Sequence, residues 1–236
     1  MSLTFTQEGR LDGRTNMERD IALLEQAEAG RPGCRVYAWD GPWVSLGRFQ
    51  SPERDLVDPG NTNWVLRPTG GKAVLHGHDV TVGLAWPLAL LPVEAGSPTP
   101  DTKHPTPSSR SLKHVYRAIV QPIVIAMRAC GVPARLAEET RFGGRGQRTA
   151  DCFAFSSPND VVDEITGLKV CGCALRLTEC AVLVQASLPN GRPLVRPENV
   201  IRNAALSYRE WDATAFAPSL EEALRKLGRR FVETAQ

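Results

Sequence analysis

The sequence contains no apolar run long enough to cross a membrane. Its longest apolar stretch, residues 80–91, is interrupted by Gly83 and Pro87 and falls short of the roughly 20 residues that a membrane-spanning helix needs. Residues 1–10 lack the apolar segment that a secretion signal requires. These absences predict a cytoplasmic protein that does not act at a membrane.

A strong charge of either sign is also missing. The 28 basic and 26 acidic side chains leave a net charge of +2 and are interspersed, so nothing indicates a nucleic-acid partner. The 6 cysteines are scattered through 236 residues, which is typical of free thiols in a reducing compartment and not of a disulfide framework. Hydrophobic residues make up 42% of the chain, which is enough to bury a sizeable core.

Several common chemical motifs do not occur. The chain has no Walker-type phosphate loop, no Gly-x-Ser-x-Gly elbow and no Cys-x-x-Cys pair. Cys171 and Cys173 would share one face of a strand and could bind zinc with a further cysteine, and His76 and His78 have the same spacing. Because no complete ligand set is evident, we expect no metal site.

The hydrophobic pattern predicts an α+β fold in one domain, with a mixed β-sheet flanked by helices. Helices are expected over 15–30, 111–130, 198–207 and 220–231. Strands are expected over 35–39, 44–48, 63–66, 73–75, 80–86, 161–165, 169–177 and 181–188. Capping boxes at Thr15/Glu18 and Ser219/Glu222 indicate two helix starts. Residues 92–110 and 141–147, rich in small and turn-forming residues, are expected to be mobile or functional loops.

A glycine pair is the first candidate for chemistry. Gly70 and Gly71 lie between Arg67 and Lys72, before the apolar residues that lead to His76. Paired glycines let the backbone approach a ligand and can point several N–H groups at an anion or a carbonyl. The alternative is an ordinary turn between two strands.

A lysine and a cysteine are the other candidates. Lys169 enters an apolar strand, where it could be a buried donor to a carbonyl or phosphate oxygen, or a strand-end side chain facing solvent. Cys152 follows a loop that contains Arg141, Arg145 and Arg148, and their positive charge would favour a reactive thiolate. Otherwise Cys152 is a small buried hydrophobic residue.

These segments occur in an order that resembles the family of lipoate-protein ligases and octanoyltransferases. The run RPTGGKAVLHGHDVT at 67–81 resembles the family's signature loop, and RVYAWDGPWVSLGRFQ at 35–50 resembles its opening hairpin. The run NDVVDEITGLKVCGCALR at 159–176 resembles the segment that carries the essential lysine, which falls on Lys169. Residues 181–189 resemble the strand that follows, and the resemblance extends over about 15–210.

The pair Cys152-Phe153 resembles the nucleophile site of the single-domain, cysteine-dependent octanoyltransferases, 17 positions before Lys169. The resemblance implies that Cys152 takes an octanoyl (or lipoyl) group from acyl carrier protein, while Lys169 stabilises the oxyanion. The acceptor would be a lysine of a lipoyl-domain protein, such as the glycine cleavage H protein or the 2-oxoacid dehydrogenase E2 component. No cofactor is expected, because the thioester supplies the driving force.

Two other functions remain open. One is an ATP-dependent lipoate-protein ligase that acts through lipoyl-AMP, with Lys169 on the adenylate. The other is a non-catalytic module that binds acyl carriers. In each case the resemblance implies substrate contacts from the two motifs. These contacts are expected at Arg67, Gly70, Gly71, Lys72, Val74, His76, Val170, Gly172 and Ala174. The apolar members Val74, Val170 and Ala174 would hold the acyl tail.

Overall fold

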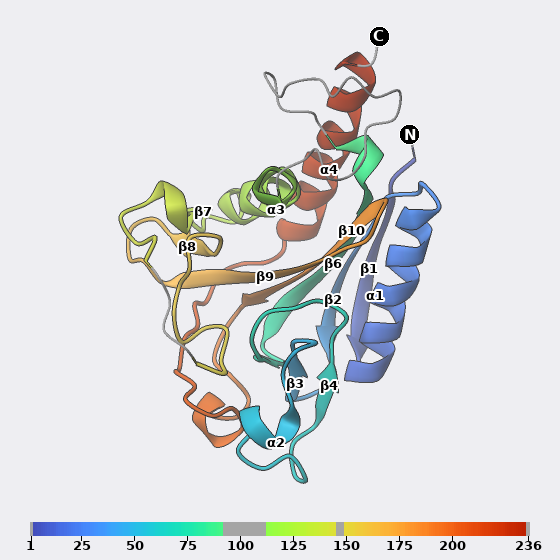
Figure 1. The fold of residues 1–236 in the computed structure, drawn as a ribbon. Helices are drawn as coiled ribbons and strands as arrows, with labels where there is room; N and C mark the ends of the chain where they lie inside the picture. The colour runs from blue at the N-terminus through green and yellow to red at the C-terminus, as the bar shows by residue number, and fades with distance from the viewer. Residues whose placement is uncertain (1, 92–111, 145–148, 235–236) are drawn as a thin grey trace.

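The computed structural model describes residues 2–91, 112–144 and 149–234. Within them, a seven-stranded mixed sheet has the order β1-β2-β6-β10-β9-β8-β7 (Figure 1). Its strands are β1 (Thr4–Leu11), β2 (Gly33–Trp39), β6 (Asp79–Pro87), β10 (Ala181–Pro189), β9 (Lys169–Leu177), β8 (Val161–Asp163) and β7 (Ala134–Leu136). The outer pair β1/β2 is parallel, and the other neighbours are antiparallel.

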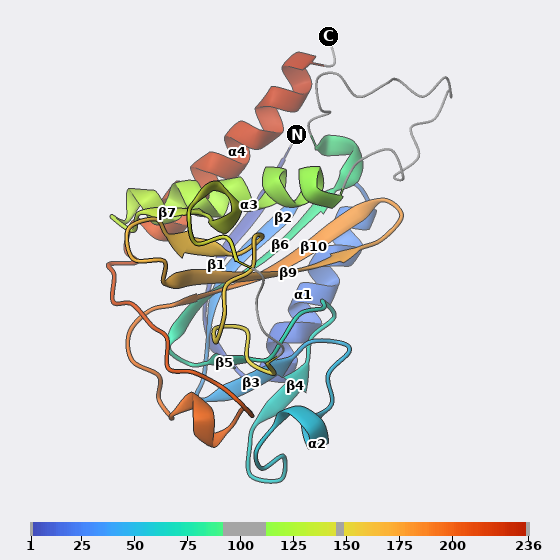
Figure 2. The same cartoon turned by 60° about the vertical axis from the view of Figure 1, so that its left-hand side comes forward.

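A second, three-stranded sheet lies at one end of the large one, as both views show (Figure 2). It consists of β4 (Trp64–Leu66), β3 (Trp43–Leu46) and β5 (Val74–His76), with the short helix α2 (Pro52–Asp55) beside it. The glycine pair predicted to bind a ligand lies in the connection between β4 and β5. The small sheet therefore presents the signature loop to the end of the large sheet.

The two faces of the large sheet carry different helices (Figure 1). The helices are α1 (Gly13–Glu28), α3 (Leu112–Ala129) and α4 (Phe216–Thr234). Side chains alternate along each strand, so one β6 residue faces one layer and the next faces the other. Leu84 joins the main core cluster under α3 and α4, whereas Ala85 packs against Leu23 and Leu24 of α1.

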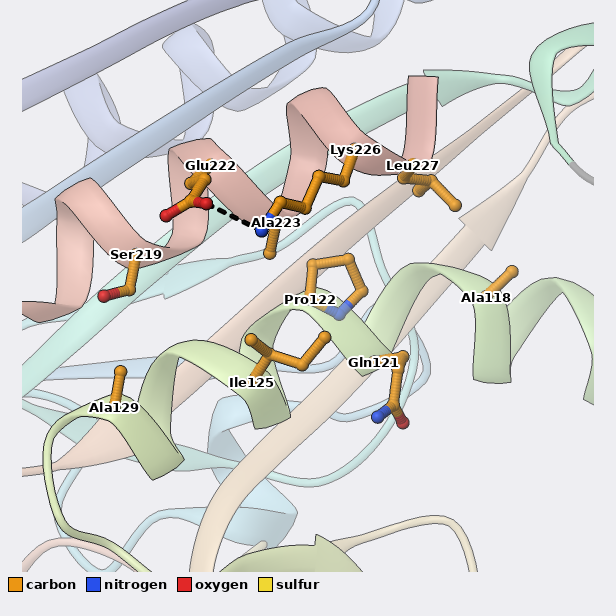
Figure 3. Close-up of a pocket in the computed structure, with 10 residues that line it drawn as sticks. All are labelled: Ala118, Gln121, Pro122, Ile125, Ala129, Ser219, Glu222, Ala223, Lys226 and Leu227. Carbon is orange, nitrogen blue, oxygen red and sulfur yellow. Dashed lines mark ion pairs between the residues drawn. The ribbon is translucent and has the colours of Figure 1, made fainter. Parts of the chain in front are cut away.

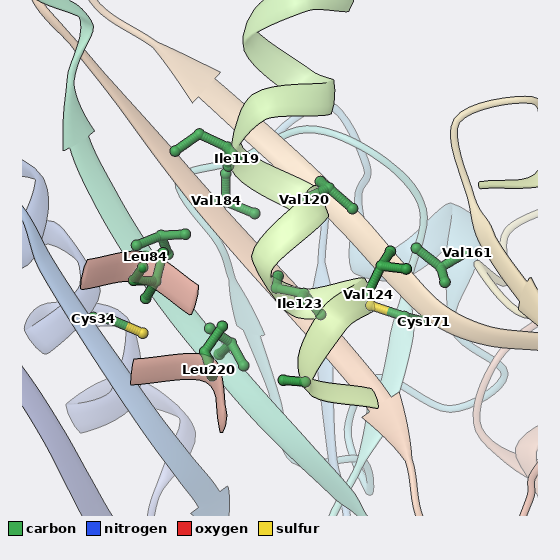
Figure 4. Packing of buried hydrophobic residues seen from close by; sticks show 14 of the residues in the cluster. Cys34, Leu84, Ile119, Val120, Ile123, Val124, Val161, Cys171, Val184 and Leu220 are labelled. Carbon is green, nitrogen blue, oxygen red and sulfur yellow. The ribbon is translucent and has the colours of Figure 1, made fainter. Parts of the chain in front are cut away.

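The main core lies between the sheet and the helices α3 and α4 (Figure 4). Ile119 and Ile123 of α3 and Leu220 of α4 are fully buried against Leu84 and Val184 of the central strands. Burying one such side chain contributes about 1.5–3 kcal/mol, so this layer stabilises the sheet substantially.

The predicted α+β architecture is confirmed, and all eight predicted strands occur with ends within two residues of those expected. Among the described residues, two strands and one α-helix were not predicted: the edge strand β1, the short strand β7 and the helix α2. The mobility predicted for 92–110 and for 145–147 concerns positions outside the described residues. No helix among the described residues is long and apolar enough to cross a membrane.

Both capping boxes were placed wrongly. Helix α1 begins at Gly13, because Asp12 is its N-cap and accepts hydrogen bonds from the backbone N–H of Arg14 and Thr15. Aspartate caps a helix as well as threonine does, and Asp12 comes first in the chain. Ser219 lies inside α4, where its N–H donates to the carbonyl of Ala215.

The predicted helix over 198–207 is wrong. Only the 3-10 turn Pro197–Asn199 forms there, and Asn203 has a φ of 54°, which no α-helix contains. Long-range contacts replace the helical hydrogen bonds: Leu56 forms a β-bridge with Ile201, and the N–H of Ala205 donates to Asp151. This segment therefore packs against the residue that precedes Cys152.

Candidate active site

Backbone hydrogen bonds attach Cys152 to the end of the signature loop. The N–H of Ala73 donates to the carbonyl of Ala150 at 2.8 Å, and the N–H of Cys152 donates to the carbonyl of Ala73 at 2.8 Å. These bonds form an isolated parallel bridge between Ala73 and Asp151. Asp151 is buried, and its carboxylate accepts from the N–H of Phe153 at 3.1 Å. The backbone at Cys152 is thus fixed by its hydrogen bond to Ala73 and by the contact between its two chain neighbours, Asp151 and Phe153.

Lys169 reaches this cysteine from β9. Its ammonium Nζ lies 3.3 Å from Cys152 Sγ, 2.7 Å from the Cys152 carbonyl oxygen and 2.9 Å from Asp160 Oδ1. Burial alone would lower the pKa of Lys169, but the negative charges of Cys152 and Asp160 outweigh it and raise that pKa above its usual value. The side chain is therefore a buried ammonium in contact with Sγ. The alternative that Lys169 faces solvent is wrong, because the residue is 5% exposed.

A register shift in β9 explains how Lys169 and Gly172 come to share a face. Three residues apart in a regular strand, they would point to opposite sides. Val161 of β8 pairs with Cys171, but Val162 pairs with Lys169, so β9 contains one extra residue, Val170. Such a bulge re-aims the side chain beside it.

Gly172 leaves the space that the cysteine occupies. A Cβ at this position would lie 2.9 Å from Cys152 Sγ and 3.5 Å from Lys169 Cε. The signature loop comes close from the other side, since a Cβ on Gly71 would lie 3.6 Å from that of Ala174. Gly71 also has a φ of 86°, which favours glycine. The structure thus brings the loop, the lysine strand and the cysteine to one place.

Arg67 fixes the shape of the signature loop. It is 5% exposed, and its guanidinium donates to the carbonyls of Gly70, Lys72 and Ser45 and to the Ser45 hydroxyl. Burial lowers the pKa of Arg67 to about 10, although the charge of Cys152 opposes this effect. Its role as a direct substrate contact stays a prediction.

His76 lies in a chain of hydrogen bonds with a Ser–His–Asp order. Its Nε2 is 2.8 Å from Ser45 Oγ, its Nδ1 is 2.7 Å from Asp79 Oδ2, and its ring stacks on Trp39 with centroids 3.9 Å apart. Burial would raise the pKa of Asp79, but His76 and the Ser187 hydroxyl hold it below its usual range. All three members of this chain are buried, and Ser45 also accepts from the signature-loop arginine. This chain of hydrogen bonds therefore connects the signature-loop arginine to the buried Asp79.

The apolar residues predicted to hold the acyl tail occupy different surroundings. Ala174 lies against the glycine pair, as described above. Val170 belongs to the main core cluster, and Val74 is 6% exposed. Their contact with an acyl tail stays a prediction.

Sequence reasoning missed Asp160 and Gln185. Asp160 precedes β8 and binds the active-site lysine. Gln185 on β10 accepts from the Thr69 hydroxyl at 2.7 Å and donates to the buried Asp20 at 2.6 Å, which ties the signature loop to α1. The available signals were a carboxylate before an apolar strand, for Asp160, and a glutamine within one, for Gln185. Neither signal identifies the side chain that the residue contacts.

The other cysteines lie outside this arrangement. Cys34 and Cys171 are buried, whereas Cys180 is exposed. The thiols of Cys171 and Cys173 lie 3.4 Å apart. Across the described parts of the chain, no group of three or more His, Cys, Asp or Glu side chains could hold a metal ion.

A cavity of about 370 Å³ lies between α3 and α4, away from the site (Figure 3). Its walls are mainly apolar, with Pro122 and Ile125 from one helix and Ala223 and Leu227 from the other. No residue predicted to take part in chemistry lines it.

Known octanoyltransferases match this chain along most of its length. No family model matches the chain. The octanoyltransferase LipM of Anoxybacillus flavithermus is 30% identical over 231 residues, which cover 87% of this chain and 77% of the relative. The octanoyltransferase LipM of Geobacillus kaustophilus is 30% identical over 244 residues, which cover 93% and 81%.

Solved structures share the fold. Lipoate-protein ligase A bound with ATP superposes with a TM-score of 0.66 at 17% identity, over 99% of this chain and 86% of that one. The bi-partite lipoate protein ligase of Thermoplasma acidophilum gives a TM-score of 0.60 at 17% identity, over 99% and 84%. The sequence relatives then specify the family: the chain belongs to the octanoyltransferase LipM family.

Proposed function

We propose that this protein is an octanoyltransferase that works through an acyl-enzyme on Cys152. The donor is octanoyl-acyl carrier protein, and the acceptor is a lysine of a lipoyl-accepting carrier protein. The observation that carries the proposal is the 3.3 Å contact between Lys169 Nζ and Cys152 Sγ. A buried ammonium beside a thiol is what a thiolate nucleophile needs. The names of the sequence relatives support the same reaction.

In the first half-reaction, Cys152 Sγ attacks the carbonyl carbon of the octanoyl thioester. The Sγ–C bond forms, the carbonyl electrons move to oxygen, and the carrier's sulfur then leaves and takes up a proton. Lys169 stands beside the reacting sulfur, where its N–H groups can stabilise the oxyanion. An acyl tail with about seven methylenes gains on the order of 5 kcal/mol on burial at ~0.8 kcal/mol each.

In the second half-reaction, the amine of the acceptor lysine attacks the acyl-enzyme. The C–N bond forms, the C–Sγ bond breaks, and Sγ returns as a thiolate beside Lys169 while the amine loses its proton to water. A thioester is exchanged for an amide, so the proposal requires neither ATP nor a metal ion. The glycine cleavage H protein and the 2-oxoacid dehydrogenase E2 lipoyl domain are the proposed acceptors.

Intact mass spectrometry after mixing with octanoyl-acyl carrier protein, without ATP, tests the proposal. One octanoyl group should appear on the enzyme and be removed by hydroxylamine. Cys152→Ser should abolish it, because a serine alkoxide does not form without a dedicated base. Cys180→Ser is the matched control, since this thiol is exposed and lies outside the site. Lys169→Ala should slow acylation by about 10²- to 10³-fold, the usual effect of losing one oxyanion donor.

The same assay distinguishes the two other functions. A Cys152→Ser enzyme that keeps full activity and requires ATP and free lipoate would be a lipoate-protein ligase. A protein that binds acyl carrier protein but transfers nothing under either condition would be a non-catalytic module. The fold is compatible with the ligase, because solved structures of lipoate ligases share it.

A further inference from the structure

The Lys169 ammonium has three hydrogens, and the structure gives it three acceptors. They are the Cys152 carbonyl oxygen at 2.7 Å, Asp160 Oδ1 at 2.9 Å and Cys152 Sγ at 3.3 Å. The first two acceptors are unaffected by acylation. The third is the atom that the reaction converts from a thiolate to a thioester.

Asp160 is itself fixed by the chain. Its other oxygen, Oδ2, accepts from the Ser157 N–H at 2.6 Å and from the Ser157 hydroxyl at 2.9 Å. Its backbone carbonyl accepts from the N–H of Ala137 at 2.8 Å, and the residue is 7% exposed. One carboxylate oxygen therefore anchors Asp160, and the other binds the ammonium of Lys169.

Acylation changes the charge around Lys169. Before it, the ammonium lies between two negative groups, the Cys152 thiolate and Asp160. Afterwards the thioester is neutral, and Asp160 is the acidic group still hydrogen-bonded to the lysine. Without Asp160, the acyl-enzyme would contain a buried ammonium with no such counter-charge, and burial would lower the pKa of Lys169.

We propose that Asp160 is a positioning residue for the second half-reaction. It keeps Lys169 charged and in place once Cys152 carries the acyl group. The N–H released from Sγ then turns to the thioester oxygen and stabilises the oxyanion as the acceptor amine attacks. When the intermediate collapses, Sγ leaves as a thiolate and again accepts a hydrogen bond from that N–H of Lys169. This inference rests on the proposed function.

The pH dependence of discharge follows from the groups that surround Lys169. They are Cys152 and Asp160 in contact with it, Asp151 on the same segment as the cysteine, and Cys171 on β9. The two carboxylate oxygens of Asp151 accept from the backbone N–H groups of Phe153 and Ala205, whereas Asp160 is the carboxylate that contacts Lys169 directly. The hydrogen bond with Cys173 and then burial raise the pKa of Cys171 well above its usual value, so this thiol does not replace Asp160 as a charged partner near neutral pH.

The test uses purified octanoyl-enzyme and hydroxylamine, which is uncharged above neutral pH and so adds no titration of its own. The ratio of the discharge rates of native and urea-denatured acyl-enzyme measures the assistance that the fold provides. In the wild type this assistance should persist from neutral to alkaline pH. In Asp160→Asn it should fall by about 10²- to 10³-fold as the pH rises and Lys169 loses its proton.

Ser157→Ala is the matched control, because it removes a hydrogen bond from Asp160 but leaves the carboxylate on Lys169. Ser157→Ala should keep the wild-type pH profile. If Asp160 acted only by maintaining local structure, both variants would change the discharge rate without changing its pH dependence. If Asp160→Asn does not fold, side-chain NMR of the wild-type acyl-enzyme reports the charge of Lys169 directly. A neutral amine there would overturn the inference.

The outcomes separate this inference from the proposed function. An Asp160→Asn enzyme that is acylated on Cys152 and discharged at the wild-type rate and pH profile would overturn the role of Asp160 alone. Absence of any acyl group on wild-type Cys152 would overturn the proposed function, and this inference with it.

Discussion

Replacing Gly172 with alanine should damage the reaction without damaging the fold. The new Cβ would lie 2.9 Å from Cys152 Sγ, whereas ordinary contacts at such positions begin at 3.4 Å. The sulfur must therefore retreat by about 0.5 Å. Gly172 does not have a positive φ, so alanine brings no backbone strain and the effect is one of space alone.

The magnitude follows from what the sulfur leaves behind. Its contact with Lys169 Nζ is 3.3 Å long, and rotating or shifting Cys152 to relieve the clash disturbs this contact. A displacement of about 1 Å can reduce a rate 10²-fold, so about half of that should slow acylation by roughly 10- to 100-fold. The melting temperature should change little.

Stopped-flow or quenched acylation by octanoyl-acyl carrier protein measures the rate, and a thermal melt monitors the fold. The matched control is Gly9→Ala, where an added Cβ meets nothing within 4 Å in the edge strand β1. It should acylate at the wild-type rate. A folded Gly172→Ala enzyme that also acylates at that rate would refute the claim that the sulfur's position is critical.

Three further changes probe the frame of the site. Gln185→Leu removes the hydrogen-bond partner of both Thr69 and Asp20. Urea melts should therefore show a free energy of unfolding that is about 2 kcal/mol lower. An unchanged midpoint would contradict the proposed link between the signature loop and α1. Asp79→Asn puts an amide where His76, Thr81 and Ser187 all donate to one carboxylate oxygen. It should lower the free energy of unfolding by about 3 kcal/mol in the same urea melts. Wild-type stability would mean that the carboxylate is dispensable. For Glu8, burial raises the pKa, but Arg35 and Arg19 more than reverse this and lower it from 4.5 to about 2, so the wild type should lose stability as the pH falls through that window. Glu8→Gln should flatten this loss in urea melts across the same range, and parallel curves for the two proteins would count against the ion pairs.

The sequence located most of the strands because they are short, mainly apolar runs; β10, for example, is buried along its whole length. Strand β1 lacks this signal, since the edge strand TFTQEGRL is mainly polar and all of its residues are exposed or half-buried. The false helix over 198–207 shows the opposite failure. Its helical pattern was real, but contacts with Leu56 and Asp151 stabilise an irregular path instead.

The candidate site also contains residues that could be predicted from the sequence and residues that could not. Cys152 and Lys169 could be predicted because they lie in motifs with a fixed order along the chain. Asp160 could not, because its importance depends on a side-chain contact with Lys169 across β8 and β9. The effect expected of Arg141, Arg145 and Arg148 on the cysteine stays a prediction, because Arg145 and Arg148 fall outside the described residues. Within the described residues, the ammonium of Lys169 contacts Sγ.

The extra residue in β9 means that the position of Lys169 is encoded by a residue count as well as by its identity. If Val170 instead paired regularly with Val162, Lys169 would turn away from the face that Gly172 shares with the cysteine. Insertions and deletions between 161 and 171 should therefore be more harmful than most substitutions there. Homologues that keep the lysine but change the length of this segment would have to reach their nucleophile along another path.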